Sequence, residues 1–268
     1  MSEPLRVEVR RGGIVESVHR VHVVTADEVF GDGALVCFLR SSLKPLQAVP
    51  LVEAYDDLGD DEIAIACASH QAEPAQLDAV RKLLARAGAT ADDLENGTQE
   101  GRPEGKLGHN CSGKHAGMLA ACRANGWPFE GYRLPEHPLQ RRIRDLVGDR
   151  PYAIDGCGVP TYALALSEMA TLFERVPQRI REAMHAHPEL VGGRGADDTD
   201  LMRARPELIA KRGAEGLFCA DGLAVKVEDG SSRAIRPVLG MLFAIADFLL
   251  VPVSNSRGED VGEITVAG

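Results

Sequence analysis

The sequence predicts a mixed α/β (α+β) protein in which a sheet is packed with helices. Alternating apolar and polar residues near the amino terminus predict strands, and stretches with a period of 3.6 residues predict helices in the middle. After Gly216, two Asp-Gly pairs indicate hairpin turns. Strands at both ends and helices between them favour a helix-covered sheet. No linker is long enough to separate domains, so we expect residues 1–268 to form a single domain.

The first elements are strands that lead into a helix. Residues 7–24 alternate in polarity across Gly12-Gly13, which predicts a β-hairpin whose edge could pair with a second copy of the chain. A third strand is expected at residues 34–39. It runs into residues 40–47, where Ser41 as a helix cap and an early Pro45 predict the start of a helix. Ser41 is therefore expected at a strand-to-helix junction.

Helices are expected through the middle of the chain. Apolar periodicity predicts them at residues 74–87, 112–125, 139–147, 162–175 and 177–187, with Gly88 and Gly126 ending the first two. Glycine-rich polar loops are expected at residues 96–108 and 191–199, and each is a candidate rim of a pocket.

The last third of the chain returns to strands. Residues 217–220 and 223–228 are joined by Asp221-Gly222, a hairpin signal. The apolar stretch at residues 237–250 predicts a buried helix packed on the sheet, followed by a short tail.

Charge and cysteine usage exclude several classes of protein. Thirty Lys and Arg against forty Asp and Glu give a net charge of −10, with no dense basic run, so nucleic acid is not an expected partner. The amino terminus lacks the apolar core of a signal peptide, and the longest apolar stretch, residues 239–253, is interrupted by Gly240 and Asp247, so no membrane association is expected. Six cysteines without paired spacing indicate reduced thiols in the cytoplasm.

Ser41 and Lys44 form a Ser-x-x-Lys motif at the predicted helix start. Residues three apart share a helical face, so the amine can reach the hydroxyl. A buried lysine loses solvation of its charged form, and its lowered pKa makes it a general base for the serine. The commoner explanation of this pattern is a serine cap with a surface lysine.

A second serine, Ser69, follows the apolar run at residues 63–66 together with His70. Reactive groups often lie where a buried segment ends. The equally good alternative is a loop whose serine or histidine caps the helix that starts near Pro74.

Cys111, Ser112, Gly113 and Lys114 nearly complete a phosphate-binding P-loop. That motif is disfavoured because His115 replaces its hydroxyl residue and a polar run, rather than a buried strand, precedes it. Cys111 and Lys114 share a helical face instead, and Cys157 lies between two glycines in a tight loop. Two thiolates suit zinc, and a neutral lysine amine could be a third ligand. The alternative is a buried thiol beside a lysine that extends to solvent.

Four segments occur together and in order: residues 40–47, Cys67-Ala68-Ser69-His70, residues 109–118, and Asp155-Gly156-Cys157-Gly158-Val159-Pro160. Together they resemble the rhizobial-type L-asparaginases, also called asparaginase II, over nearly the whole chain. The resemblance implies a fold similar to serine β-lactamases and glutaminases. It also implies two Ser-Lys pairs, Ser41 with Lys44 and Ser69 with Lys226.

The resemblance further implies zinc held by Cys111, Lys114 and Cys157, which tunes substrate affinity and is not strictly required for the chemistry. Arg40, Asp155 and His115 are the expected substrate-binding residues. The expected activity is hydrolysis of L-asparagine, a small-molecule substrate, to aspartate and ammonia by a homodimer. Two alternatives remain open: a glutaminase or broader serine amidohydrolase, and a non-catalytic protein that binds zinc or an amino acid.

Overall fold

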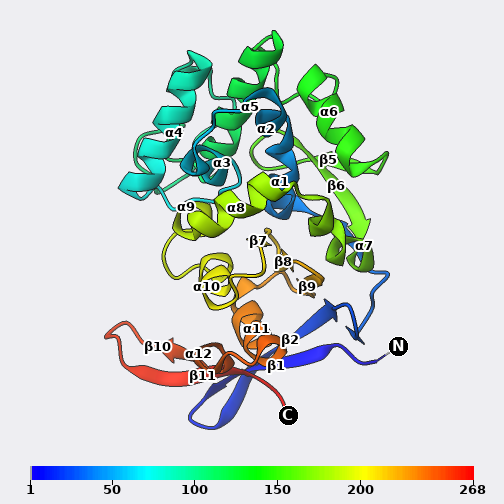
Figure 1. Ribbon diagram of the computed structural model, residues 1–268. Helices are drawn as coiled ribbons and strands as arrows, with labels where there is room; N and C mark the ends of the chain where they lie inside the picture. The colour runs from blue at the N-terminus through cyan, green and yellow to red at the C-terminus, as the bar shows by residue number, and fades with distance from the viewer. Residues whose placement is uncertain (1) are drawn as a thin grey trace. The chain divides into compact units, whose positions relative to one another are not determined.

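The computed structural model describes residues 2–268, which divide into two compact units (Figure 1). Unit 1 contains residues 2–37, 164–174 and 212–268, and unit 2 contains residues 38–163 and 175–211. The combination of an antiparallel sheet with helices confirms the predicted mixed α/β (α+β) class. The expectation of a single domain stays a prediction. Among residues 2–268, the helices are all too short or too polar to cross a membrane.

Unit 1 is built on an antiparallel sheet. Its strands are β1 (Leu5–Arg11), β2 (Ile14–Val24), β3 (Val29–Phe30), β8 (Leu217–Ala220), β9 (Leu223–Val227), β10 (Val251–Ser254) and β11 (Asp260–Val266). The strand order is β10-β11-β1-β2-β9-β8, with β3 beside β2. Both predicted hairpins are confirmed. Strand β1 is internal, between β2 and β11, and β2 pairs with β9 only over Val21–Val24; pairing of the hairpin edge with a second copy stays a prediction.

The carboxyl-terminal part of unit 1 differs from the prediction. The expected helix at residues 237–250 is divided into α11 (Ile235–Phe243) and α12 (Ala246–Leu249). Ala244 adopts a left-handed conformation with φ of 52°, which ends α11. The expected short tail contains β10 and β11, and α11 packs against β11. The polar period-2 pattern of β11 is too weak to predict this strand.

A second error concerns the helix predicted at residues 162–175. Residues Pro160–Ala165 form β6, which pairs with β5 (Tyr152–Ile154) in unit 2, and the rings of Tyr152 and Tyr162 lie 6.2 Å apart. This aromatic cross-strand pair favours the strand over a helix. The helix α7 begins only at Leu166 and ends at Ala170 in unit 1, where it packs on β9.

Unit 2 is mainly helical (Figure 1). Its elements are η1 (Arg40–Leu43), α1 (Lys44–Gln47), α2 (Val49–Ala54), α3 (Asp60–Ala66), α4 (Pro74–Ala87), η2 (Ala91–Asp93), α5 (Ser112–Asn125), α6 (Pro138–Val147), α8 (Gln178–Ala186), α9 (Pro188–Gly192) and α10 (Asp197–Ala204). The strand β4 (Val36–Phe38) and the short elements η3 (Leu172–Arg175) and β7 (Ala210–Arg212) lie where the chain passes between units. Helices α4, α5, α6 and α8 confirm the predictions. The loop expected at residues 191–199 lies largely in α9 and α10.

Helix α5 is the centre of unit 2, and it packs against α2, α3 and α4. Every residue from Ser112 to Cys122 is buried. Gly113 permits this packing, because a Cβ atom there would lie 2.2 Å from the carbonyl oxygen of Ile65. Turns rather than a strand precede α5, so the P-loop context is missing. Buried polar side chains on α5 require partners, and they locate the candidate site.

The strand-to-helix junction at Ser41 is confirmed, although Ser41 is not a cap. The cap position of η1 is Leu39, with no side-chain cap bond. Arg40 has a φ of 49°, a conformation that is uncommon for a residue with a side chain. Its backbone N–H donates to Thr161 Oγ1 at 2.8 Å, which holds this turn against β6.

Candidate active site

Lys44, the first residue of α1, is completely buried in unit 2. Its Nζ lies 2.6 Å from the carbonyl oxygen of Ala68 and 2.9 Å from Ser69 Oγ, and it also hydrogen-bonds with the sulfur of Cys111. Burial lowers the pKa of Lys44, although the thiol of Cys111 opposes the shift. Lys44 Nζ donates to the carbonyl oxygen of Ala68 and to Ser69 Oγ, so the amine and the hydroxyl of Ser69 lie within hydrogen-bonding reach.

The structure brings Ser69 to Lys44 from the loop after α3. The backbone N–H of Ser69 donates to the carbonyl oxygen of Val191 at 2.8 Å, which holds this loop in place. Ser69 is only 5% exposed, whereas Ser41 is half-buried. The backbone N–H of Lys44 donates to the carbonyl oxygen of Ser41, but within residues 2–268 no side-chain hydrogen bond joins the Ser41 hydroxyl to the Lys44 amine. The sequence spacing predicted the Ser41–Lys44 pair, and the hydrogen bond that forms is the one between Ser69 and Lys44.

Cys111, Lys114 and Cys157 converge in unit 2. Lys114 Nζ donates to Cys157 Sγ at 2.9 Å, and the thiols of Cys111 and Cys157 hydrogen-bond to each other. All three side chains are buried. Cys157 reaches this position from the loop after β5, where Gly158 has a φ of 87°. The convergence predicted for these residues is therefore present.

The electrostatics of this thiol cluster favour a thiolate at Cys111. The hydrogen bond from Cys157 lowers the pKa of Cys111, and the charges of Lys44 and Lys114 act in the same direction against burial. The same thiol pair and burial raise the pKa of Cys157. For Lys114, burial lowers the pKa, but the sulfurs of Cys157 and Cys111 outweigh it and raise the pKa. These shifts favour the thiolate form of Cys111 and the ammonium form of Lys114.

The donor set of this cluster fits a thiophilic metal. Two cysteine sulfurs suit zinc, and the amine of Lys114 becomes a ligand when a metal displaces its proton. A search of residues 2–268 finds no group of three or more His, Cys, Asp or Glu side chains placed to hold a metal ion. A zinc site here therefore depends on the lysine as its third ligand.

Arg40 and Asp155 form an ion pair next to the thiol cluster, with Nε and Oδ1 2.6 Å apart. Burial opposes ionisation of Asp155, but the charges of Lys114 and Arg40 outweigh it and lower the carboxyl pKa. The backbone of Asp155 also closes the loop, since its carbonyl oxygen accepts from Gly158 N at 2.8 Å. The pair places a guanidinium group and a carboxylate near the thiols. These two groups can bind the α-carboxylate and the α-ammonium group of an amino acid.

His115, expected to bind substrate, is completely buried on α5. Its Nδ1 lies 2.7 Å from the hydroxyl of Tyr132. Burial lowers the pKa of His115 to about 4, although a hydrogen-bonding interaction with the Cys157 sulfur opposes the shift. The imidazole is therefore neutral at pH 7. Its substrate-binding role stays a prediction.

Lys226, expected as the lysine of the second pair, belongs to β9 in unit 1. Its Nζ donates to the carbonyl oxygens of Glu215 and Val227, each at 2.6 Å. Unit 2 contains another lysine, Lys211, which is completely buried and lies 2.7 Å from Asp198 Oδ2. Burial raises the pKa of Cys67, two residues before Ser69, to about 12, and the charge of Lys211 opposes this shift.

Sequence reasoning missed Lys211 and its partner. Lys211 lies on β7 and follows the apolar residues Ile209 and Ala210, and a lysine directly after an apolar pair is a weak signal for burial. Asp198 lies in an acidic first turn of α10 that resembles an exposed helix start.

Comparison with known proteins identifies a family for this chain. The family model for L-asparaginase II matches residues 7–266, which is nearly the whole chain. A search of the curated proteins finds none that matches. The family supports an asparaginase-type amidohydrolase that acts on a small-molecule substrate. On the strength of this match, together with the Ser-Lys and Cys-Lys cluster in unit 2, the chain belongs to the L-asparaginase II family.

Proposed function

We propose that the protein hydrolyses L-asparagine to L-aspartate and ammonia through a serine nucleophile, with Lys44 as the general base. Membership of the L-asparaginase II family supports the reaction. The single observation that carries the mechanism is the placement of Ser69 Oγ 2.9 Å from the completely buried amine of Lys44. A desolvated amine is a competent base for a serine hydroxyl.

A difference in exposure supports different roles for the two serines. Ser41 is half-buried and lies on the turn before α1, so its hydroxyl can meet a substrate. Ser69 is 5% exposed and bonded to Lys44, so it is suited to transfer a proton. Ser41 attacks the side-chain carbonyl carbon of asparagine, and its proton passes through Ser69 to Lys44. The protonated lysine then supplies the proton with which ammonia leaves, and water hydrolyses the ester to release aspartate.

The ion pair of Arg40 and Asp155 supports recognition of the amino-acid part of asparagine. The guanidinium group can pair with an α-carboxylate and the carboxylate with an α-ammonium group. Arg40→Lys keeps the charge and loses the planar fork, so we expect a raised KM and a smaller change in kcat.

The mechanism is tested by ammonia release from L-asparagine. We expect Ser41→Ala, Ser69→Ala and Lys44→Met each to reduce kcat by at least about a thousand-fold. When catalytic groups act together, removal of any one of them loses most of the rate enhancement that the set provides. Ser167→Ala, at an exposed serine, is the matched control. Full activity in both Ser41→Ala and Ser69→Ala would refute the mechanism.

The second lysine remains part of the proposal. Lys226 would assist Ser69, and Lys226→Ala is expected to lower kcat in the same assay. Unchanged activity in Lys226→Ala would remove Lys226 from the mechanism.

The thiol cluster is proposed to hold zinc through Cys111, Lys114 and Cys157. Bound there, zinc supplies a fixed positive charge that favours substrate binding. Metal analysis after dialysis should find zinc in the wild type and much less in Cys111→Ser and Cys157→Ser. Cys122→Ser is the matched control, because Cys122 is a buried cysteine of the same unit that lies on α5. Equal zinc content in all three variants would refute the site.

Two other functions are separated by the same assays. A glutaminase or broader serine amidohydrolase would release ammonia faster from glutamine or another amide than from asparagine. One methylene changes transition-state binding by only about 1–3 kcal/mol, so rates on both amino acids are required. A non-catalytic zinc- or amino-acid-binding protein would hold zinc and release no ammonia. The homodimer is likewise proposed, and light scattering of the purified protein measures it.

A further inference from the structure

The side chain of Gln76 joins two segments of unit 2. Gln76 lies on the first turn of α4 and is only 1% exposed. Its Oε1 accepts from the backbone N–H groups of Gln71 at 2.9 Å and Glu73 at 3.1 Å. Its Nε2 donates to the carbonyl oxygens of Glu189 at 2.8 Å and Leu190 at 3.5 Å. An amide oxygen can accept two hydrogen bonds and an amide nitrogen can donate two, so every position on this amide is filled.

Both segments that Gln76 joins hold Ser69. One segment is the loop between α3 and α4, in which Ser69 lies two residues before Gln71. The other is α9, where the carbonyl oxygen of Val191 accepts from the backbone N–H of Ser69 at 2.8 Å. Val191 directly follows Leu190, one of the carbonyl partners of Gln76. The amide of Gln76 therefore links the backbone around Ser69 to the helix that accepts its N–H.

A neighbouring glutamine reinforces the same contact. Gln71 Nε2 donates to the carbonyl oxygens of Gly192 at 3.3 Å and Arg194 at 3.4 Å. A Cβ atom on Gly193 would lie 2.8 Å from Gln71 Cδ, so the chain after α9 turns closely around this side chain. The backbone of Gln71 is thus held by Gln76, and its side chain is held by the end of α9.

Helix capping explains only the bond between Gln76 and Glu73. Glu73 is the N-cap residue of α4 and Gln76 occupies position N3, so this bond belongs to a capping box. The other three bonds lead out of the helix, to Gln71 and to α9. An exposed side chain would serve the cap equally well, whereas a buried amide is costly unless all its partners are present. The burial of Gln76 is therefore explained by the link to α9.

We propose that Gln76 is a positioning residue for the hydrolysis, which holds Ser69 Oγ 2.9 Å from Lys44 Nζ by joining the Ser69 loop to α9. The inference rests on the proposed function, in which Ser69 passes a proton to Lys44, and it names the side chain that sets the geometry of that step. Proton transfer requires heavy atoms about 2.6–3.2 Å apart. A displacement of about 1 Å costs on the order of a hundred-fold in rate. The bonds of Gln76 are to backbone groups, so it acts through Ser69 rather than on the substrate.

The test compares Gln76→Glu with Gln76→Met. Glutamate keeps both acceptor bonds, including the one that caps α4, but its carboxylate cannot donate to Glu189 and Leu190. The two backbone N–H donors favour the ionised carboxylate, and the assay is run at about pH 8. Methionine has a similar volume and makes none of the hydrogen bonds. In both variants, we expect kcat for ammonia release from L-asparagine to fall by about a hundred-fold, with KM close to that of the wild type.

Hydrogen exchange of the Ser69 backbone amide is a second readout, and it needs no substrate. This N–H is bonded to Val191, so its protection reports the contact between the loop and α9. We expect its protection factor to fall by about tenfold or more in Gln76→Glu. The amides in the second half of α4 should keep the protection of the wild type, because the cap is retained.

Gln140→Met is the matched control. Gln140 is another completely buried glutamine of unit 2, and its Nε2 donates to the carbonyl oxygen of Tyr132 at 2.9 Å. The substitution therefore removes a buried amide and its bond to a backbone carbonyl, away from the Ser69 loop and α9. Both kcat and the exchange of the Ser69 amide should stay close to those of the wild type.

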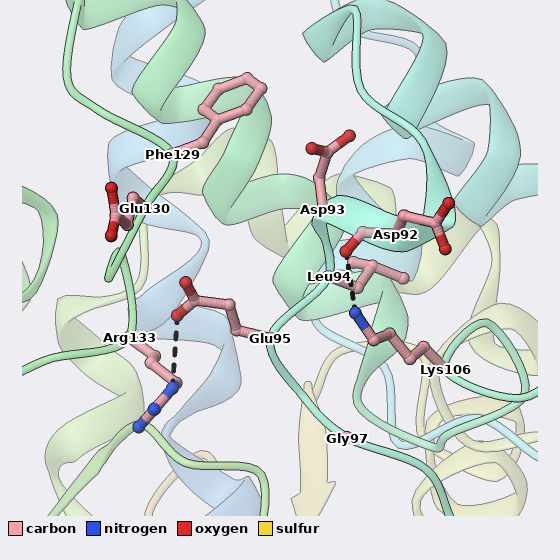
Figure 2. A pocket seen from close by; sticks show the side chains of 9 residues that line it. All are labelled: Asp92, Asp93, Leu94, Glu95, Gly97, Lys106, Phe129, Glu130 and Arg133. Carbon is pink, nitrogen blue, oxygen red and sulfur yellow. Dashed lines mark hydrogen bonds and ion pairs between the residues drawn. The ribbon is translucent and has the colours of Figure 1, made fainter.

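The segment that Gln140 contacts borders a different cavity. This cavity of about 550 Å³ in unit 2 is lined in part by Phe129, Glu130 and Arg133, and Figure 2 shows the ion pair of Arg133 with Glu95. The loop predicted as a pocket rim contributes Gly97 and Lys106 to it. The residues that line this cavity belong to segments other than the Ser69 loop and α9, so Gln140→Met tests burial of an amide without testing the proposed link.

A wild-type kcat in Gln76→Glu would overturn the inference, because capping alone would then explain Gln76. So would a loss of kcat with unchanged exchange at Ser69, or a raised KM with unchanged kcat. If Gln76→Met does not fold, Gln76→Glu decides alone, since it keeps the cap of α4. If the wild type releases no ammonia but Gln76→Glu still loses protection at Ser69, the proposed function is refuted and the positioning of Ser69 by Gln76 is supported.

Discussion

His70 makes folding stability depend on pH in a way that can be worked out from its bonds. Its Nδ1 accepts from the backbone N–H of Ala72 at 3.1 Å. Its Nε2 lies 2.8 Å from Ser112 Oγ, and that hydroxyl donates to the carbonyl oxygen of Leu107 at 2.7 Å. Nε2 must therefore donate to Ser112. A second proton on Nδ1 would point at the N–H of Ala72, so the site accepts only neutral His70.

The magnitude follows from the shift in pKa. Burial is the main cause that lowers the pKa of His70 to about 3. In the unfolded chain, the pKa is about 6.5, so the unfolded state takes up a proton first as the pH falls. Stability is complete above the unfolded pKa and is lost as the pH falls from there toward the folded pKa. At pH 5, about 1.5 pH units below the unfolded value, the loss is about 2 kcal/mol.

The assay is urea unfolding at pH 7.5 and pH 5.0. In His70→Gln, the decrease in the free energy of unfolding between these pH values should be about 2 kcal/mol smaller than in the wild type. The comparison within each variant cancels any direct cost of the substitution. Ser112→Ala keeps His70 buried and should retain a decrease close to that of the wild type. His115, with a pKa of about 4, contributes a similar decrease that remains in both variants.

The reasoning fails if His70→Gln shows the same decrease as the wild type. It also fails if Ser112→Ala loses the decrease, because the hydrogen bond and not the titration would then set the pH dependence.

Two further predictions concern packing and buried charge. Asp198→Ala leaves the ammonium group of Lys211 buried without its carboxylate, since both side chains are completely buried. Urea unfolding should show that the free energy of unfolding falls by about 3–5 kcal/mol, and Asp198→Leu/Lys211→Met should recover part of it. A decrease below about 1 kcal/mol would show that the ion pair contributes little to stability. Gly113→Ala would force α5 away from Ile65, so the unfolding midpoint of this variant should fall by an amount equivalent to about 1–3 kcal/mol or more. In Gly156→Ala the added Cβ meets nothing within 4 Å, so the unfolding midpoint should stay close to that of the wild type. Equal midpoints for the two alanine variants would contradict the packing argument.

Local signals account for the elements that the sequence predicts correctly. Period-2 alternation around Gly12-Gly13 and the Asp221-Gly222 turn both specify hairpins through short-range backbone geometry. Helix α5 ends at Gly126, which adopts the left-handed conformation expected after a helix. The same signals fail at residues 160–165, because an apolar and aromatic run suits a strand or a helix and the pairing with Tyr152 decides between them.

The candidate site depends on contacts between segments that are distant in sequence. The motifs identified Ser69, Lys44, Cys111 and Cys157 as reactive types, but the Ser-x-x-Lys spacing pointed to Ser41 as the partner of Lys44. The bond from Ser69 to Val191 carries Ser69 to the amine, and no local pattern encodes it. The sequence gives no signal for Tyr132 for the same reason, because its hydroxyl bonds to Glu95 and His115, which lie in other segments of the chain.

The central claim is that a serine attacks the amide and carries the acyl group. The most direct test is to mix the protein with L-asparagine, quench within milliseconds, digest, and weigh the peptides by mass spectrometry. The account predicts an added aspartyl group on the peptide that contains Ser41, retained in Ser42→Ala and absent in Ser41→Ala. An aspartyl group on Ser69 would exchange the roles of the two serines. Steady ammonia release with no acylated peptide at any quench time would contradict the covalent mechanism.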